Sequence, residues 1–294
     1  MANLKAIRIR IVSVKSTRQI TSAMKMVSAA KLRKAQDKIV RLRPYANKLH
    51  EILVGLTQSL ADTEVENVYG RRSSPEKVLL VVITSNRGLC GAFNSNVIKE
   101  TRRVLAEKYS VQYSKGNVWL LTIGKKGYDY FRKQKINLLP EKNQLVSDLT
   151  FGKVEEAAGQ VMQSFASGEF DRVEIIYNQF KNAAVQNLTN ESFLPVEIVN
   201  AGKMKTVPVD YIYEPDKEAI VMELIPKSLK IQFYKAVLDS FVAEHGARMT
   251  AMHKATDNAT NMIRDLTLQY NKARQASITS QILEVVSGAE ALRG

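Results

Sequence analysis

The chain has 294 residues, of which 45% are hydrophobic and 24% charged, an ordinary balance for a globular protein with a sizeable core. The formal net charge of +14 predicts an acidic or polyanionic partner: nucleic acid, an anionic membrane surface or an acidic protein. The single cysteine, Cys90, excludes an internal disulfide and fits a reducing compartment. No run of about 18 apolar residues is present, so no membrane span is expected, and the basic N-terminus lacks the features of a signal peptide.

Residues 1–57 predict one long helix, because no glycine precedes Gly55 and apolar residues recur at steps of three and four. At the helical rise per residue it would be roughly 80 Å long. Strict heptad register would place four polar residues in the apolar seam: Arg18, Thr21, Lys25 and Ser28. The apolar stripe shifts sideways here to three neighbours: Ile20, Met24 and Val27. A local break in the phase of the repeat is therefore expected.

A compact α/β region is predicted over residues 75–215. Apolar, β-rich segments predict strands at 77–84, 118–124, 172–180 and 191–199. Helices are predicted between them, at 94–109, 125–134 and 154–168. This alternation is typical of a parallel, Rossmann-like sheet.

The C-terminal segment predicts a second long helix, with Ser228 as a plausible N-cap after Pro226. Its apolar stripe includes Phe233, Val237, Met252, Ala255, Ala259, Met262, Leu266, Tyr270 and Val285. Each long helix needs a partner, and an antiparallel pair is the simplest solution. The predicted fold is therefore an antiparallel coiled coil with an inserted Rossmann-like α/β domain. Its parts are a coiled-coil helix at 1–60, an α/β domain at 75–215 and a coiled-coil helix at 225–294.

Chemistry-bearing motifs are weak. The glycine-bearing turn at 85–94 follows a strand and precedes a helix, so it could place backbone N–H groups around a phosphate. It matches neither common nucleotide-binding glycine motif, and Cys90 within it has no nearby histidine to activate it. The histidines lack metal-site spacing, and no pair of carboxylates stands out as an acid/base couple. We expect no catalytic residue, no metal and no cofactor.

Two alternative functions follow from the residues. The first is a basic coiled-coil nucleic-acid-binding protein, because residues 1–57 carry thirteen Lys/Arg against two acids. Those charges go around the helix, however, and no aromatic residue for stacking occurs in residues 1–44. The second is a nucleotide-dependent enzyme that uses the 85–94 turn.

Four segments closely resemble the signature segments of F-type ATP synthase gamma subunits of the bacterial type. They are residues 9–36, 85–94, 211–216 and 251–279, and they lie in the family's order over essentially the whole chain. The resemblance implies a non-catalytic rotor shaft that couples rotation of the membrane c-ring to ATP synthesis or hydrolysis. The implied partners are the alpha and beta subunits, the epsilon subunit and the c-ring, with no nucleic acid and no direct lipid span. The implied place is the cytoplasmic side of the bacterial plasma (inner) membrane, as a peripheral protein.

Partner contacts are carried over from the family onto matching positions of this chain. The resemblance implies that Met24 and Lys25 face an acidic loop of beta and that Arg274, Gln275 and Thr279 contact another beta loop. The remaining implied contacts are Arg8, Lys31 and Arg33 on the first helix, Arg87 and Cys90 on the turn, and Tyr213 and Glu214 facing the c-ring. Two positions depart from the family's pattern, since Asn86 replaces a common Asp and Gln281 replaces a usual Glu. One cysteine excludes the regulatory dithiol of plastid relatives.

Overall fold

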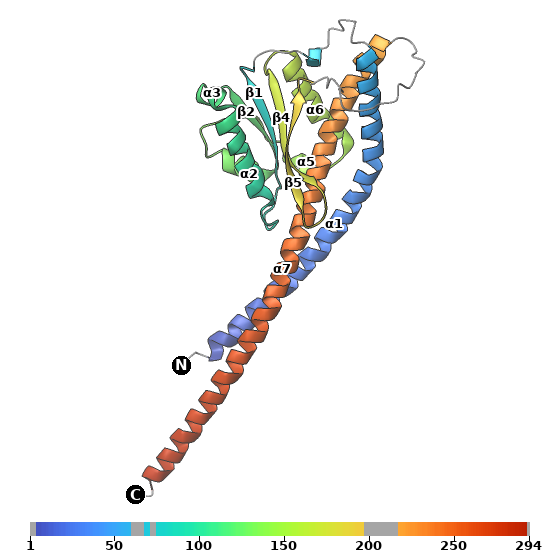
Figure 1. Cartoon of the computed structure of the whole chain (residues 1–294). Helices are drawn as coiled ribbons and strands as arrows, with labels where there is room; N and C mark the ends of the chain where they lie inside the picture. The colour runs from blue at the N-terminus through green and yellow to red at the C-terminus, as the bar shows by residue number, and fades with distance from the viewer. Residues whose placement is uncertain (1–3, 60–67, 71–74, 197–216, 293–294) are drawn as a thin grey trace. The chain divides into compact units, whose positions relative to one another are not determined.

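A computed structural model describes residues 4–59, 68–70, 75–196 and 217–292. The chain divides into two compact units, one formed by Ala29–Arg248 and the other by Met1–Ser28 together with Met249–Gly294. Two long helices, α1 (Leu4–Ser59) and α7 (Lys217–Ala291), contribute to both units (Figure 1). The expected long helix at each end of the chain is confirmed.

A five-stranded sheet forms the centre of the Ala29–Arg248 unit, with the strand order β3-β2-β1-β4-β5. Its strands are β1 (Val78–Ile83), β2 (Val118–Ile123), β3 (Asn137–Leu138), β4 (Arg172–Phe180) and β5 (Gln186–Leu194). The first four pair in parallel, as expected. All six residues of β1 are buried, because a central parallel strand is covered on both faces.

The last strand corrects the expectation for residues 191–199. β5 lies at 186–194 and pairs antiparallel with β4, so the sheet is mixed. The five residues between β4 and β5 are too few for a parallel crossover, which needs a dozen or more. Asn182 closes this hairpin, because its side-chain oxygen accepts the backbone N–H groups of Ala184 and Val185.

Helices cover both faces of the sheet (Figure 1). One face carries α2 (Phe93–Arg103), which continues into the π-helical turn η2 (Val104–Lys108), together with the short helices α3 (Ser110–Ser114) and α4 (Lys125–Phe131). The other face carries α5 (Gln144–Ser147), α6 (Phe151–Ala166) and the first part of α7. A short 3-10 turn, η1 (Val68–Gly70), lies before β1.

The N-cap expected at Ser228 is wrong. α7 begins at Lys217, and both Pro226 and Ser228 lie inside it. Ile225 and Leu229 flank the proline and are buried, and Phe233 one turn later packs on Phe193 of β5 with ring centroids 5.5 Å apart. This packing holds the helix through a residue that lacks a backbone donor.

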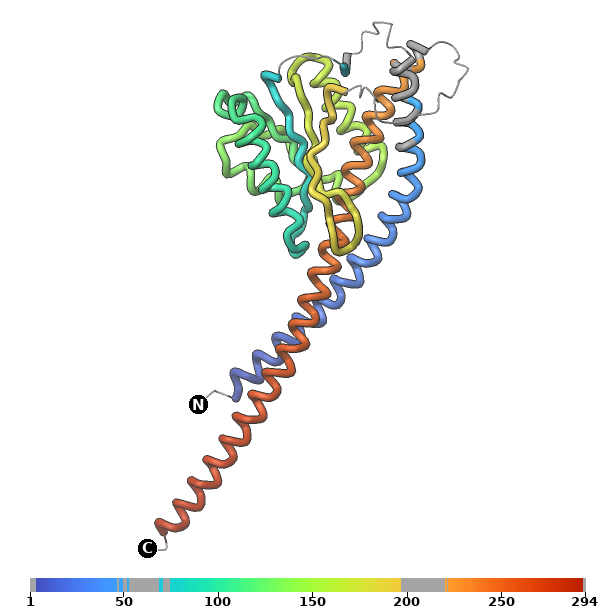
Figure 2. The backbone as a smooth tube through the Cα atoms, viewed as in Figure 1, coloured from blue at the N-terminus to red at the C-terminus, as the bar shows by residue number. Residues whose placement is uncertain are grey.

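The smaller unit consists of one segment from each long helix, side by side (Figure 2). Thr21 contacts Thr256, and Lys25, one turn later in α1, contacts His253, earlier in α7. The partner number falls as the α1 number rises, so the segments are antiparallel. Buried Met252, Ala259 and Leu266 repeat every seven residues along α7.

The expected phase break is also wrong. Thr21 and Ser28 are buried in the seam, whereas Ile20 and Val27 are 58% and 57% exposed. The strict heptad register therefore runs through this segment, with polar residues inside it. On α7, Met262 and Val285 were expected in the stripe but are exposed. Within the described ranges, no helix is long and apolar enough to cross a bilayer.

Candidate functional site

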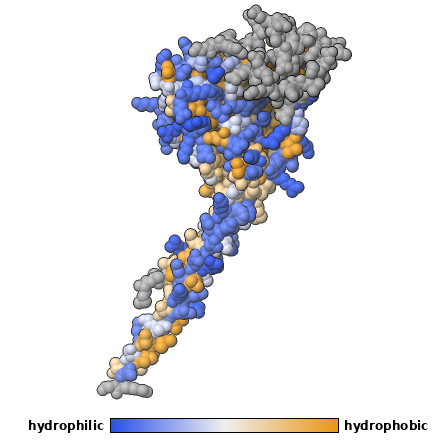
Figure 3. All heavy atoms as spheres, in the orientation of Figure 1, coloured by the Kyte–Doolittle hydropathy of each residue, from blue (hydrophilic) through white to orange (hydrophobic). Residues whose placement is uncertain are grey.

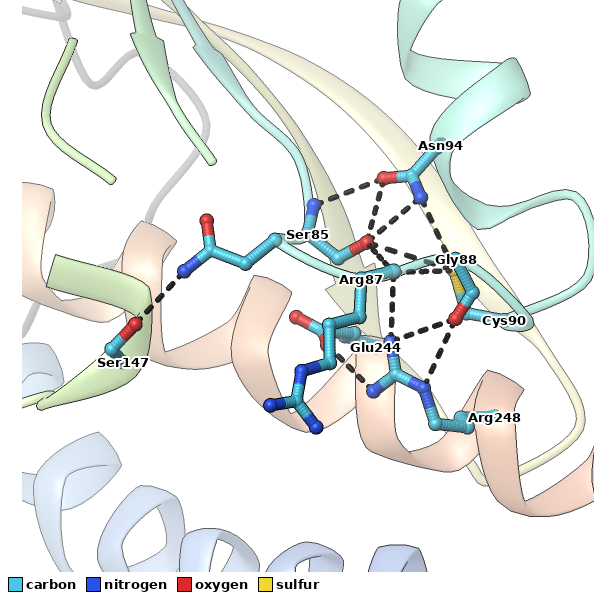
Figure 4. A network of polar contacts seen from close by, with 9 residues as sticks. Ser85, Arg87, Gly88, Cys90, Asn94, Ser147, Glu244 and Arg248 are labelled. Atoms are coloured by element: carbon cyan, nitrogen blue, oxygen red, sulfur yellow. Dashed lines mark hydrogen bonds and ion pairs between the residues drawn. The ribbon is translucent and has the colours of Figure 1, made fainter. Parts of the chain in front are cut away.

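The turn between β1 and α2 is held by a network of polar contacts (Figure 4). Ser85 fixes it, because its backbone N–H donates to Asn94 Oδ1 at 2.9 Å and its hydroxyl donates to the Arg87 carbonyl at 2.6 Å. Leu89 and Gly91 both have positive φ, at 61° and 59°. Glycine adopts this conformation freely, but Leu89 does so at an energetic cost.

Arg248 of α7 holds the turn from the other side (Figure 4). Its Nη2 donates to the carbonyls of Arg87 at 3.0 Å and Gly88 at 3.3 Å, and its Nη1 pairs with Glu244 at 2.6 Å. Both charged side chains are buried. Burial raises the pKa of Glu244, and the adjacent Arg248 opposes that shift.

The turn is therefore built around a cation. The backbone carbonyl oxygens of Arg87 and Gly88 in this turn accept hydrogen bonds from the Arg248 guanidinium. A phosphate site would instead present backbone N–H groups to its ligand. The turn also follows β1, which lies beside β4 at the point where the strand order reverses, and doubly wound sheets bind ligands at such a point. Here α7 covers that place, since Ala243 packs on Cys90 and Phe93.

Cys90 lies beneath the turn, with its side chain 1% exposed. Burial raises the pKa of its thiol, so the reactive thiolate is disfavoured. Of the predicted contacts on this turn, Arg87 is exposed. The neighbouring Leu89 is also exposed and was not predicted as a contact, although the sequence shows an apolar residue between Gly88 and Gly91 of this turn.

Asn86 departs from the family's pattern but has partners. Its side-chain nitrogen donates to the Asn143 carbonyl at 3.0 Å and to Ser147 Oγ at 2.9 Å. Its side-chain oxygen accepts the backbone N–H of Lys125 at 3.0 Å. The amide thus links the turn to α4 and α5, and its two donor bonds would be lost with an aspartate.

The helical pair carries the next group of predicted residues. Lys25 Nζ lies 3.5 Å from His253 Nδ1, and Met24 beside it is half-buried. Arg8 is exposed on the same helix. In the other unit, Lys31 and Arg33 are exposed. The Lys31 charge opposes the burial that raises the pKa of Glu244, and it adds to the burial that lowers the pKa of His245.

The last turns of α7 hold Arg274, Gln275 and Thr279, all exposed. Thr279 donates its hydroxyl to the Gln275 carbonyl at 3.0 Å, so it is engaged within the helix. The sequence predicted no exposed apolar contacts around them, and it placed Val285 in the buried stripe. Several large apolar side chains are exposed: Ile278, Ile282, Leu283, Val285 and Val286. Apolar residues are visible along this end in Figure 3.

Two further polar centres were not predicted. Arg43 of α1 reaches Asp239 of α7, with Nη2 3.6 Å from Oδ1, and also donates to the Phe180 carbonyl at 3.4 Å. His245 is buried, and neither ring nitrogen has a hydrogen-bond partner among the described residues. Burial lowers the pKa of His245 to about 4.

Tyr213 and Glu214, predicted to face the c-ring, lie outside the described residues. Over the residues that are described, no group of three or more His, Cys, Asp or Glu side chains could hold a metal ion.

Comparisons with known proteins agree over the whole chain. The family described as ATP synthase matches residues 3–292. The ATP synthase gamma chain of Flavobacterium johnsoniae is 56% identical, with 100% of both chains covered, and that of Cytophaga hutchinsonii is 51% identical, with 99% of both covered. One similar solved structure is a chain from the central stalk and c-ring of Tetrahymena thermophila mitochondrial ATP synthase, which is 25% identical. The TM-score is 0.60, and the match covers 80% of this chain and 99% of the other. A chain of the Euglena gracilis mitochondrial ATP synthase, 22% identical, has the same fold, with a TM-score of 0.64 and coverage of 98% and 94%.

Proposed function

The chain belongs to the ATP synthase gamma-chain family, and we propose that it is the central rotor shaft of a proton-translocating F-type ATP synthase. In this role it couples rotation of the membrane c-ring to ATP synthesis or hydrolysis in the ring of alpha and beta subunits. The observation that carries the proposal is the antiparallel pair of α1 and α7 with its continuous heptad seam. Two paired helices resist bending and twisting better than one.

The exposed apolar residues at the C-terminal end of α7 support the proposal that another protein surrounds this end. Every residue from 281 to 292 is exposed, and five of the large apolar side chains at 278–286 face solvent. A chain with such a patch is expected to bury it against another protein. We propose the inner surface of the alpha/beta ring, with Arg274, Gln275 and Thr279 as polar contacts.

The proposal makes this subunit non-catalytic. The turn at 85–94, the one candidate nucleotide site from the sequence, presents carbonyls to Arg248 and is covered by α7. ATP chemistry is therefore assigned to the partners. No feature of the described residues favours the nucleic-acid alternative.

Other contacts belong to the same proposal. Arg8, Met24, Lys25, Lys31 and Arg33 are assigned to beta, as is the exposed tip formed by Arg87 and Leu89. The epsilon subunit and the c-ring are assigned to the part that includes Tyr213 and Glu214. The protein is then peripheral, on the cytoplasmic side of a bacterial plasma membrane. The functional parts in this proposal are residues 1–60, 75–215 and 225–294.

Reconstitution tests the proposal. Purified alpha and beta subunits are mixed with the full chain or with a chain that lacks residues 281–294, and assembly and ATP hydrolysis are followed. We expect one copy per ring, sustained hydrolysis with the full chain and weaker assembly with the truncated chain. Absence of any complex, under conditions in which the Flavobacterium johnsoniae gamma chain assembles, would refute the proposed role.

A further inference from the structure

One end of the α/β domain carries a cluster of exposed cations at the start of β2 and β3. We call it the basic edge and define it as Lys115, Arg132, Lys133 and Lys135. All four are exposed. Lys115 follows α3, and the other three lie in the turn between α4 and β3.

The fold brings these two segments together. β2 pairs in parallel with β3, with Trp119 opposite Asn137. Asn137 also donates its side-chain N–H to the Gly116 carbonyl at 2.7 Å, which joins the turn before β3 to the turn before β2. Lys115 and Lys135 therefore flank neighbouring positions at one end of the sheet.

The basic edge has no acidic partner within the part of the chain that the structure describes. Two cations on the same face of the sheet are neutralised locally, since Arg103 pairs with Glu100 and Glu107, and Lys108 pairs with Glu174. No such pair involves the four cations of the basic edge. Arg132 lies over the Tyr128 ring, 5.8 Å from its centroid, which leaves its charge available.

Two exposed apolar side chains precede Lys115 along the chain. Val111 and Tyr113 of α3 are 60% and 39% exposed, only a few residues before Lys115. Figure 1 shows α3 at the margin of the domain, and the same margin in Figure 3 is mainly hydrophilic. Cations beside an exposed tyrosine and valine match the interface of a membrane, where aromatic rings lie at headgroup level and Lys/Arg meet anionic lipid.

We propose that the basic edge contacts anionic lipid headgroups. The inference rests on the proposed function, which places the chain beside a membrane. A fluid lipid surface presents the same charge at every rotation angle, so attraction to it would not stop a rotor at one position. Duplex nucleic acid would use the cations but leave Val111 and Tyr113 without a role.

Vesicle flotation tests this inference on assembled alpha/beta complexes that contain the full chain. The probes are phosphatidylcholine vesicles with and without phosphatidylglycerol. One variant carries Lys115→Gln, Lys133→Gln and Lys135→Gln. Its matched control carries Lys125→Gln, Lys126→Gln and Lys181→Gln, three exposed lysines that follow β2 and β4 at their other ends.

We expect binding only to the anionic vesicles, weakened at least about tenfold by the edge variant and less than about twofold by the control, since each cation near the surface contributes to lipid binding. Tyr113→Ser should lower the binding that persists at high salt. Equal losses in edge and control variants, or no binding by the wild-type complex, would overturn the inference. Assembly and ATP hydrolysis are measured on the same samples, so a failure of the rotor proposal is seen separately.

Duplex DNA is the competing ligand in the same assay. If DNA displaces the complex from anionic vesicles and the edge variant loses DNA binding alone, the basic edge recognises nucleic acid and the lipid assignment is wrong. If DNA has no effect on the edge-dependent component, the lipid assignment stands.

Discussion

Thr21 of α1 and Thr256 of α7 share a hydrogen bond, with their hydroxyl oxygens 2.8 Å apart. Each hydroxyl also lies near a carbonyl of its own helix, that of Arg18 at 3.0 Å and that of Met252 at 2.8 Å. Burial of a hydroxyl without a hydrogen bond costs free energy, and this pair avoids that cost. The polar seam residues thus face α7, and the apolar Ile20 and Val27 face outward.

Charges placed on these two faces of α1 should have different effects. Thr21→Glu or Ser28→Glu buries a carboxylate without a built partner, and we expect a loss of about 2 kcal/mol or more in the free energy of unfolding. Ile20→Glu and Val27→Glu are matched controls on the exposed face and should change stability by about 0.5 kcal/mol or less. Urea unfolding of the isolated chain, followed by circular dichroism, measures both. A larger loss of stability for Ile20→Glu and Val27→Glu than for Thr21→Glu and Ser28→Glu would contradict this seam and support the predicted phase break.

Arg248 should contribute to stability in a pH-dependent way. Arg248→Ala leaves Glu244 buried and unpaired, and we expect a cost of about 3 kcal/mol near neutral pH. Burial raises the pKa of Glu244, so the charged carboxylate is disfavoured in the folded chain. The loss of stability from this buried charge grows as pH rises through the raised pKa. The cost of Arg248→Ala should therefore shrink on acidification.

Adding Glu244→Gln to Arg248→Ala provides the control. The double variant should recover part of the loss at neutral pH and should show no matching gain in acid. The free energy of unfolding is measured in urea at several pH values. If Arg248→Ala lowers it by the same amount at every pH, the ion pair between Arg248 and Glu244 does not contribute to stability.

His245 should make the fold sensitive to acid. Burial lowers its pKa from 6.5 to about 4, with Arg248 and Lys31 acting in the same direction. The unfolded chain then binds the proton more readily, so stability is lost as pH falls from 6.5 through about 4. Glu244 and Asp239 shift in the opposite sense, because burial raises their pKa values.

The comparison of wild type with His245→Leu isolates the histidine. We expect the variant to lose less stability than wild type between pH 7 and pH 4, by roughly 2 kcal/mol. His253→Leu, at an exposed histidine, is the control and should follow wild type. Parallel curves for wild type and His245→Leu would contradict the assignment.

Cys90 should resist thiol reagents in the folded chain. Its side chain is buried, and burial raises the pKa of the thiol, so little thiolate is available. We expect reaction with a chromogenic disulfide reagent to follow the rate of unfolding in urea. A chain with Cys90→Ser and Lys99→Cys, which places the thiol on the exposed face of α2, should react promptly. Prompt reaction of wild type would mean that the turn opens readily.

Periodicity in the sequence was enough for the long helices and the parallel strands. The run at 77–84 predicted β1 because it is short, rich in β-branched residues and almost entirely apolar, as a strand buried on both faces is. The seam could not be predicted from apolar character alone, because Thr21 is buried through a hydrogen bond to a residue 235 positions away. Arg248 was missed for the same reason, since the carbonyls it binds lie about 160 residues earlier.

The central claim is that this chain rotates within a ring of alpha and beta subunits. The direct measurement immobilises the ring and attaches a bead to the chain through Lys99→Cys in a Cys90→Ser background, on the exposed face of α2. On addition of ATP, we predict that the bead turns continuously in one direction and stops when ATP is removed. A stationary bead in complexes that continue to hydrolyse ATP would contradict the account.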